Sequence, residues 1–277
     1  MACVAAATKS ESNAACALTS ARGTLTAMID NVFRQDGYRL RLEWAGEGIA
    51  ALVEHCAVMV VVDVLSFSTS VDVALSRGAR VLPLRWRDER ARVAAKAAGA
   101  VLAGEQQWTL RPASLVDLPA GTLLALPSPN GATLCAQADV DGVTVLAGCL
   151  RNASAIVKAA LAVAAGAPIG LIPAGERWDV TTGGPLRPGI EDLLGAGAIA
   201  AALLATDATD ASSEVRLAAM AFLSAVAELS SLLEGCSSGR ELIAAGHRAD
   251  IELATELERS TAVPLLRNGV FEDKRRA

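Results

Sequence analysis

One carboxylate stands near the end of an apolar run and is followed at once by hydroxyl side chains. The stretch reads VVVDVLSFSTS from Val60 to Ser70, and Asp63 is its acidic residue. An ionised Asp inside a buried strand costs several kcal/mol unless it is paired or coordinates a cation. We therefore expect a compensating partner at Asp63.

Polar residues also follow the other apolar runs of the chain. In open parallel sheets, ligands collect at the carboxyl ends of the strands, where helices begin and present unpaired N–H groups. The residues at these positions are Glu105 after 100–103, Ser128, Asn130 and Gly131 after 122–126, Asn152 after 143–147, Arg177 after 169–173, and Glu191 and Asp192 at a later helix start. Acidic, hydroxyl and amide groups are thus expected at one end of the sheet.

Several carboxylates at one edge favour a hard divalent cation with oxygen ligands, most simply Mg²⁺. With hydroxyls, an Asn-Gly turn and an Arg nearby, the matching ligand is a small anionic molecule that carries phosphate. Neither a G-x-x-x-x-G-K-[ST] loop nor a G-x-G-x-x-G motif occurs in the sequence, which excludes those routes to phosphate binding.

Purely structural explanations compete with these assignments. They are a capping box of Thr69 with Asp72, a simple turn at Asn130-Gly131, helix-dipole stabilisation of Glu191 and Asp192, an N-cap at Asn152 and a surface position for Arg177. Asp63 and Glu105 are harder to explain in this way, because both end apolar strands where an unpaired carboxylate is costly.

The elements that must position these residues alternate between strands and helices. Strands are predicted over 58–65, 79–84, 100–103, 122–126, 143–147 and 169–173, and helices over 69–77, 88–98, 132–138, 153–165 and 191–204. This alternation predicts an α/β fold, a layered α/β/α domain with a mainly parallel sheet. A helical C-terminal segment, formed by 214–233 and 240–258 without strands, completes a single domain over 28–277, after a disordered tail over 1–27.

Composition limits the partners of the protein. The net charge of −5 and the lack of a basic run argue against nucleic acid, and the apolar runs are shorter than the ~18 residues of a membrane span. Six scattered cysteines without a C-x-x-C pair indicate reduced, mostly buried thiols and a cytoplasmic protein. A homodimer is compatible with the sequence.

Six stretches in order resemble the 2-phosphosulfolactate phosphatase family. They are VVVDVLSFSTSVDVALSRGA, LAGE, LPSPNGATL, VLAGCLRNASAIV, IPAGE followed by GIEDLLGAGAI, and CSSGRELIAAGHRADIELATELERSTAVPLL, and they span roughly Val58 to Leu266. The resemblance implies an α/β fold and a Mg²⁺-dependent phosphoric monoester hydrolase that converts 2-phospho-3-sulfolactate to 3-sulfolactate and phosphate, a step of coenzyme M biosynthesis.

The resemblance also implies roles for individual residues. Metal ligands would be Asp63, Glu105, Glu191 and Asp192; the substrate would be bound by Ser68, Thr69, Ser128, Asn130, Gly131, Asn152 and Arg177. The implied mechanism is in-line attack of a metal-bound water on phosphorus, with Asp63 as a catalytic residue and Glu105 or Glu191 as general base.

The chain departs from the family at Ser66 and in the stretch Ser128-Pro129-Asn130-Gly131-Ala132, where the family often has Thr-Thr-Asn-Gly-Thr. The departure at Ser66 bears on the substrate. The family usually has Arg where this chain has Ser66, so a bidentate anion partner is lost there, and Arg177 or Arg187 could supply the missing cation. Two alternatives therefore stay open: a phosphatase for a different phospho-acid, and an anion-binding homologue without catalysis.

Overall fold

The computed structural model describes residues 32–178, 184–206 and 210–275. The chain divides into two units, Met1–Gly37 and Tyr38–Ala277. The predicted tail over residues 1–27 lies outside the described residues. All elements discussed below belong to the second unit.

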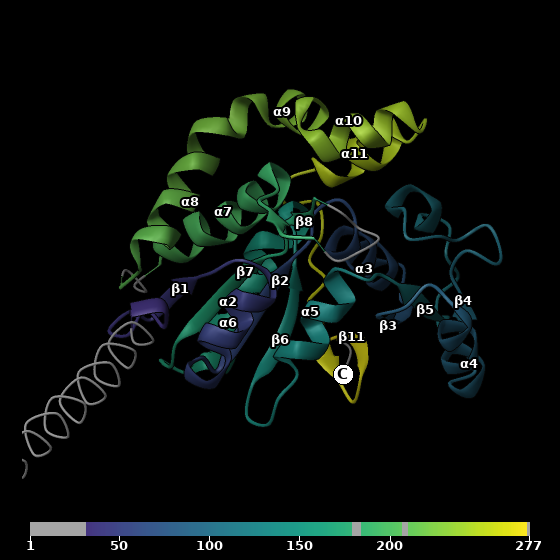
Figure 1. Cartoon of the computed structure of the whole chain (residues 1–277), viewed down its shortest axis with the longest axis horizontal. Coiled ribbons are helices and arrows are strands. Elements are labelled where there is room, and N and C mark those ends of the chain that lie inside the picture. The colour runs from purple at the N-terminus through teal and green to yellow at the C-terminus, as the bar shows by residue number, and fades with distance from the viewer. Residues whose placement is uncertain (1–31, 179–183, 207–209, 276–277) are drawn as a thin grey trace, which may run out of the picture. The chain divides into compact units, whose positions relative to one another are not determined.

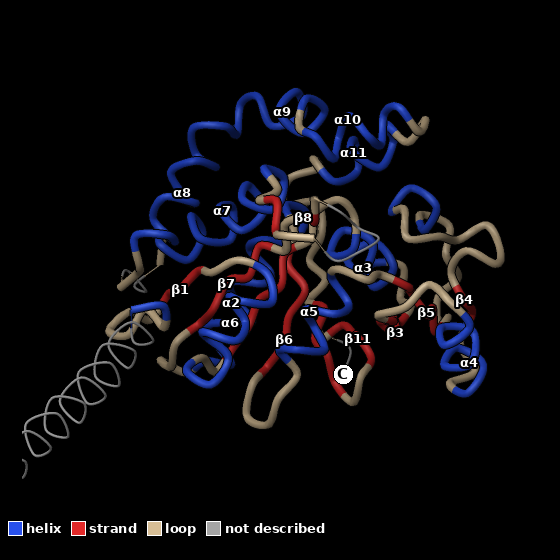
Figure 2. Tube along the Cα trace, viewed as in Figure 1, coloured by secondary structure: helices blue, strands red, loops and turns tan. Residues whose placement is uncertain are grey.

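A nine-stranded sheet forms the centre of this unit (Figures 1 and 2). Its strand order is β1-β7-β2-β6-β10-β11-β3-β5-β4. The strands are β1 Leu40–Leu42, β2 Val58–Val62, β3 Arg80–Leu84, β4 Val101–Leu102, β5 Leu123–Pro127, β6 Thr144–Gly148, β7 Ile169–Pro173, β10 Pro264–Arg267 and β11 Val270–Asp273. Neighbouring strands are parallel except where β10 or β11 takes part. The predicted layered α/β fold with a mainly parallel sheet is confirmed.

Helices cover both faces of the sheet, because the central strands are apolar on both sides. In β2, Val58, Val60 and Val62 point into one core cluster, and Met59 and Val61 point into the other. The first face carries α6 Ala153–Ala164 and α7 Ile190–Leu204; the second carries α2 Ala45–Leu52, α3 Phe67–Ser76 and α5 Gly131–Ala138, while α4 Glu89–Ala97 covers the β3–β5 region.

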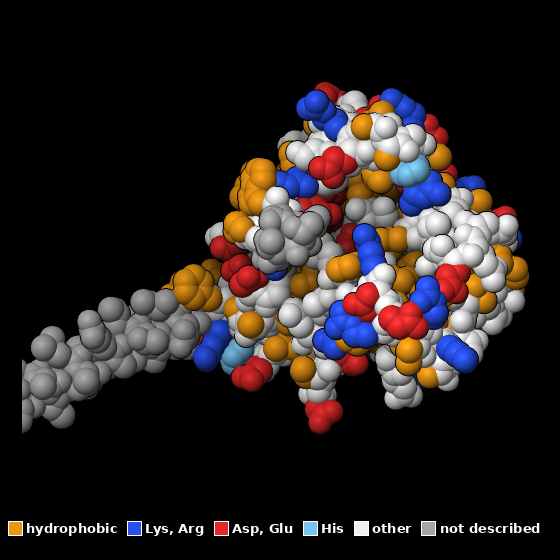
Figure 3. Space-filling view, turned by 45° about the vertical axis from the view of Figure 1, so that its right-hand side comes forward, with side chains coloured by type: hydrophobic (Ala, Val, Ile, Leu, Met, Phe, Trp, Pro, Cys, Tyr) orange, Lys and Arg blue, Asp and Glu red, His pale blue; other side chains and the backbone are white. Residues whose placement is uncertain are grey.

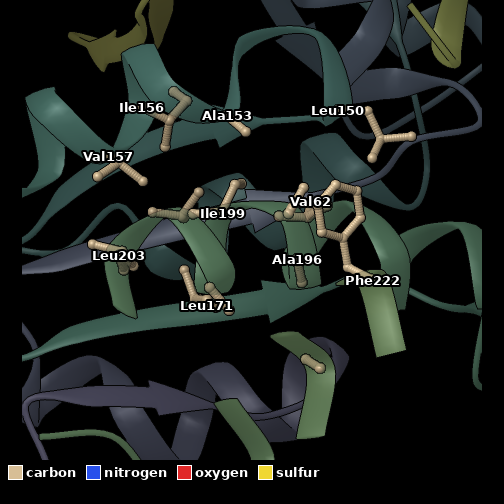
Figure 4. Packing of buried hydrophobic residues seen from close by; sticks show 14 of the residues in the cluster. Val62, Leu150, Ala153, Ile156, Val157, Leu171, Ala196, Ile199, Leu203 and Phe222 are labelled. Carbon is tan, nitrogen blue, oxygen red and sulfur yellow. The ribbon is translucent and has the colours of Figure 1, made fainter. Parts of the chain in front are cut away.

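The core on the first face is built around α7. Ala196, Ile199 and Leu203 of α7 lie among Val62 and Leu171 of the sheet and side chains of α6 (Figure 4). On its other side α7 packs against α8 Ser213–Ala225, and a Cβ at Gly197 would lie only 2.3 Å from the Ala218 carbonyl oxygen. The small residues of α7 therefore allow a close helix pair outside the sheet.

The C-terminal segment is helical as predicted, but strands follow it. After α8 come η4 Val226–Glu228, α9 Leu229–Gly235, α10 Ser237–Ala244 and α11 Arg248–Ala254. The segments predicted as helical contain no strand, but β10 and β11, for which no element was predicted, follow them and form a hairpin between β6 and β3. The remaining short elements are η1 Val53–His55, η2 Pro112–Leu115, η3 Leu150–Asn152, β8 Glu176–Arg177 and β9 Leu186–Arg187.

Two expectations from composition can be compared with the described residues. Cys56, Cys135, Cys149 and Cys236 are buried free thiols, as predicted. One helical stretch, Ser213–Gly235, is long and apolar enough by length and composition to cross a membrane, with a mean hydropathy of 1.5. Its side chains Val215 and Phe222 pack into the core of the folded unit, whereas Leu217, Met220 and Leu223 are exposed.

Candidate active site

A pocket of about 1020 Å³ lies at the carboxyl ends of the parallel strands. Asp63 and Ser66 reach it from the end of β2, Ser128 and Asn130 from the end of β5, and Glu176 from the end of β7. The C-terminal helical segment contributes Ser237, Glu241, Leu242 and His247. In Figure 3, side chains of both charges surround a hollow beneath the C-terminal helices. The pocket therefore lies at the edge of the sheet where the sequence predicted a ligand site.

Asp63 is buried at the base of this pocket, with 5% of its surface exposed. Its Oδ1 accepts a hydrogen bond from the Phe67 N–H at 3.2 Å, and its own N–H donates to Ser68 Oγ at 3.0 Å. Burial raises the pKa of Asp63 to about 6; the Phe67 N–H opposes this rise and the charge of Glu191 adds to it. The carboxylate thus has backbone donors but stands next to further negative charge.

Gly131 begins α5 directly against Asp63. A Cβ at this position would lie 2.4 Å from Phe67 Cδ1 and 2.7 Å from Asp63 Oδ2. Phe67 is fully buried, so it has no free space into which it could move. The close approach of the α5 N-terminus to Asp63 therefore requires glycine at position 131.

Replacing Gly131 with alanine is expected to lower the free energy of unfolding by about 1–3 kcal/mol, the usual range for over-packing a core. Urea denaturation measures this change. Gly235→Ala is the matched control, since no atom lies within 4 Å of a Cβ there, and its stability should be unchanged or slightly higher. Equal stabilities of the two variants would show that the Phe67 contact is not tight.

Asp192 joins two loops beneath the pocket. Its Oδ1 accepts from the Val64 N–H at 2.7 Å and its Oδ2 from the Gly175 N–H at 2.8 Å. Asn130 Nδ2 donates to the Gly175 carbonyl at 2.6 Å, so Gly175, in the left-handed region at φ +61°, connects both side chains. Burial, followed by the charges of Asp63 and Glu191, raises the pKa of Asp192 well above its usual range.

Glu191 is also buried, but its oxygens are directed towards α10. Oε1 accepts from Ser238 Oγ at 2.5 Å, and Oε2 accepts from Cys236 Sγ at 3.4 Å. Its charge still acts on Asp63 and Asp192, whose pKa values burial raises first and Glu191 raises further. Glu191 therefore acts on the buried carboxylates by its charge, although it is not part of the pocket wall.

Glu176 is a pocket residue for which the sequence analysis made no prediction. It lies in β8, half-buried in the pocket wall. Burial, with the charges of Asp63 and Glu191, raises the pKa of Glu176 to about 7, and Arg187 opposes this rise. Its place directly after β7, one residue before the predicted Arg177, is the signal that could have identified it.

Glu105 does not lie where the sequence predicted. The carboxylate is exposed, with 48% of its side-chain surface accessible, and it accepts a hydrogen bond from Arg92 Nε at 2.9 Å. It does not line the pocket that contains Asp63. The argument that a buried strand ends in an unpaired carboxylate therefore fails for Glu105, because β4 is a two-residue strand at the sheet edge.

Three predicted substrate-binding residues instead hold the backbone. Ser68 Oγ donates to the Val61 carbonyl at 3.2 Å, and Thr69 Oγ1 donates to the Val64 carbonyl at 2.8 Å. Asn152 is fully buried and precedes α6 without a side-chain capping bond to that helix; its Oδ1 instead accepts from the Cys149 N–H at 2.9 Å. The expectation that these hydroxyl and amide groups face a ligand is not met in this conformation.

Cations surround the acidic pocket floor. Arg87, Arg111, Arg177 and Arg187 line the pocket together with His247. Arg177 is the only one of these arginines that was predicted as a substrate residue. Its Nη2 lies 3.7 Å from Glu47 Oε2. A mixture of buried carboxylates and arginines at strand ends is suited to an anionic ligand whose charge must be both bound and neutralised.

Among the described residues, no three His, Cys, Asp or Glu side chains are arranged to share a metal ion. The four predicted ligands thus do not form a ready-made cluster. Glu105 is remote, and the oxygens of Glu191 and Asp192 accept hydrogen bonds from other groups.

In open α/β sheets, a pocket at the carboxyl ends of the strands is the usual place of a small-molecule site. The family model described as 2-phosphosulpholactate phosphatase matches residues 49–269, most of the chain. The chain belongs to this family and is a phosphoric monoester hydrolase. The resemblance predicted from the six stretches is confirmed.

Proposed function

We propose that this phosphatase hydrolyses 2-phospho-3-sulfolactate to 3-sulfolactate and phosphate, a step towards coenzyme M, in a Mg²⁺-dependent reaction. The observation that supports this most directly is the pocket itself, in which Asp63 and Glu176 stand among four arginines. A substrate with phosphate, sulfonate and carboxylate groups carries several negative charges, and arginine binds such groups through charge-assisted hydrogen bonds.

The electrostatics of the pocket favour a bound cation such as Mg²⁺. The pKa values of Asp63 and Glu176 are raised by burial and by neighbouring carboxylates, so a positive charge there would relieve an electrostatic cost. Proteins usually hold Mg²⁺ by one or two carboxylates together with water and substrate phosphate. We propose Asp63 as the principal ligand of the ion. Glu191 and Asp192 would add negative charge near it. When bound, the ion would neutralise charge on the phosphoryl oxygens.

Two residues of the chain would bind the phosphoryl group and accept the proton of the attacking water. Arg87 enters the pocket beside Asp63 and would hold the phosphoryl group for in-line attack. Glu176 would accept a proton from the attacking water, a role that is favoured when the pKa of the carboxylate lies near neutral pH. The water oxygen forms a bond to phosphorus as the P–O bond to the C2 oxygen breaks, phosphate leaves, and the C2 oxygen takes up a proton from solvent to give the alcohol.

A second candidate is a phosphatase for a different phospho-acid. Ser66 lines the pocket at the position where the family usually has Arg, so the anion contacts differ from those of typical relatives. An anion-binding homologue without turnover is the remaining alternative. A cytoplasmic location, a homodimer and the absence of nucleic-acid or membrane partners stay predictions.

Hydrolysis assays separate these candidates. The purified chain is expected to release phosphate from p-nitrophenyl phosphate with added Mg²⁺, and excess EDTA should abolish this activity until Mg²⁺ is restored. Binding of phosphate without any turnover would support the non-catalytic alternative. A panel of phospho-acids with and without a sulfonate then tests the substrate: the proposal requires the highest kcat/KM for 2-phospho-3-sulfolactate.

A further inference from the structure

The four arginines of the pocket differ in the carboxylates on which their charges act. Burial raises the pKa values of Asp63 and Glu176, and the charges of Arg87 and Arg187 respectively oppose these rises. Arg177 lies within ion-pair distance of Glu47. Among the described residues, only Arg177 of these four has a carboxylate within ion-pair distance, whereas Arg87 and Arg187 act on Asp63 and Glu176 from farther away.

Arg111 differs from all three, because its charge is not among the main causes of the pKa shifts of Asp63 and Glu176 and, among the described residues, it has no ion pair like that of Arg177. Within the part of the chain that the structure describes, no carboxylate lies within 4.0 Å of its guanidinium nitrogens. Its charge opposes the rise in pKa that burial causes at Asp250, but Asp250 is outside the pocket wall and accepts a hydrogen bond from the Ala113 N–H. The positive charge of Arg111 is therefore available to a ligand in the pocket.

The backbone on both sides of Arg111 is fixed. Ser70 Oγ of α3 donates to the Leu110 carbonyl at 2.5 Å, and the Ala113 N–H donates to Asp250 Oδ1 of α11 at 2.8 Å. The segment that carries Arg111 is thus attached to the helix after Asp63 on one side and to the C-terminal helical segment on the other.

The guanidinium is also held in place. Nη1 lies 2.7 Å from His247 Nδ1, and Nε donates to Thr109 Oγ1 at 3.3 Å. An arginine can only donate, so His247 Nδ1 must accept and the imidazole carries its hydrogen on Nε2. A neutral His247 thus orients the guanidinium without neutralising its charge.

We propose that Arg111 binds the second acidic group of the substrate, the sulfonate or carboxylate that accompanies the phosphate, and that His247 is its positioning residue. This inference rests on the proposed function for the identity of the substrate. On this proposal, Arg111 is the cation that compensates for the arginine missing at position 66. Neither Arg177 nor Arg187 has this role. The specificity for a phospho-acid over a simple phosphate ester would then come from Arg111.

Isothermal titration with two probes tests the assignment. The probes are 3-sulfolactate, which carries sulfonate and carboxylate but no phosphate, and inorganic phosphate. Arg111→Ala is expected to raise the Kd for 3-sulfolactate at least about tenfold, as for loss of a hydrogen bond to a charged group. The Kd for phosphate should change less than about twofold, because Arg111 is not expected to contact the phosphate group. Arg248→Ala is the control, because Arg248 follows His247, pairs with Glu234 and does not line the pocket; both its Kd values should match the parent's.

Two variants of His247 separate positioning from general stability. His247→Leu removes the acceptor and should raise the Kd for 3-sulfolactate about threefold or more, as for loss of a neutral hydrogen bond. His247→Asn should restore it, since Asn Oδ1 can accept from Arg111 where His Nδ1 does. If the Asn variant binds as weakly as the Leu variant, His247 does not act by accepting this bond.

Other outcomes overturn the role of Arg111. An unchanged Kd for 3-sulfolactate in Arg111→Ala, an equal loss for both probes, or no binding of 3-sulfolactate by the parent would each do so. Turnover distinguishes this failure from failure of the proposed function. Arg111-dependent binding of 3-sulfolactate without hydrolysis of 2-phospho-3-sulfolactate contradicts the function alone, whereas Mg²⁺-dependent hydrolysis that is insensitive to Arg111→Ala contradicts this inference alone.

Discussion

Replacing Asp63 with asparagine is expected to lower Mg²⁺-dependent phosphatase activity at least about 100-fold, because a metal-binding carboxylate supplies both affinity and the placement of charge. The side chain lies at the base of the pocket, and the backbone groups that surround it can bind the amide oxygen of asparagine as well. Steady-state assays with p-nitrophenyl phosphate over a range of Mg²⁺ concentrations measure the loss. Near-normal turnover at saturating Mg²⁺ would contradict the assignment.

The same variant should fold at least as well as the parent when metal is removed. Burial, with the charge of Glu191, already holds the pKa of Asp63 at about 6, so a neutral side chain relieves a cost at neutral pH. The melting temperature in EDTA is expected at or above that of the parent. Asp141→Asn, an exposed change in the loop before β6, is the matched control for both activity and melting. A lower melting temperature for Asp63→Asn alone would show that the activity loss reflects misfolding.

Replacing Glu176 with glutamine is expected to lower kcat by about 10²–10³-fold, within the range for loss of a general base, with a smaller change in KM. Glutamine keeps the shape of the side chain but cannot accept a proton at neutral pH. Glu105→Gln is the informative comparison. The sequence argument gives Glu105 a catalytic role, whereas its exposed position beside Arg92 predicts activity within about twofold of the parent. A loss at Glu105 as large as that at Glu176 would favour the sequence argument.

Metal-free stability provides an independent measurement on the same carboxyl group. Burial, together with Asp63 and Glu191, raises the pKa of Glu176 from its usual 4.5 to about 7, so the folded chain binds this proton more tightly than the unfolded chain. The stability from this group is fully present below the unfolded pKa and is lost as pH rises through the folded pKa. In EDTA, the melting temperature should therefore fall between about pH 5 and pH 8, and less steeply in Glu176→Gln. Equal slopes would show that Glu176 does not titrate in this window.

The sequence predicted the alternating part of the fold well, for a physical reason. A strand such as β2 is apolar on both faces and is therefore recognisable as a buried strand, and α4 and α7 begin and end within about one residue of the expected positions. β1 and the hairpin β10–β11 were missed. They are only three or four residues long, and such short runs differ little from loops until their pairing partners are known.

The candidate site was predictable where burial forced an explanation. Asp63 follows a fully buried strand, so its need for a partner could be inferred from local sequence. Glu105 was misjudged because an apolar run does not reveal whether its strand is central or at the edge. Ser68 and Thr69 were misjudged because hydroxyl groups also satisfy backbone carbonyls near helix starts. Arg111 and His247 are 136 positions apart, and no local pattern connects them.

The position of the β10–β11 hairpin also bears on how the protein is made. Among the described strands, β1, β7, β2 and β6 form one hydrogen-bonded group and β3, β5 and β4 form another, and only the hairpin links the two. The pocket takes Asp63 from the first group and Ser128 from the second. A ribosome-bound chain can pair strands within each group, but it cannot close the sheet until residues 264–273 have left the exit tunnel. Folding of the pocket is therefore expected to be a late step that depends on contacts of high sequence separation. Nascent chains that stop short of the hairpin would expose two unpaired strand edges, at β6 and β3, to aggregation or to chaperones.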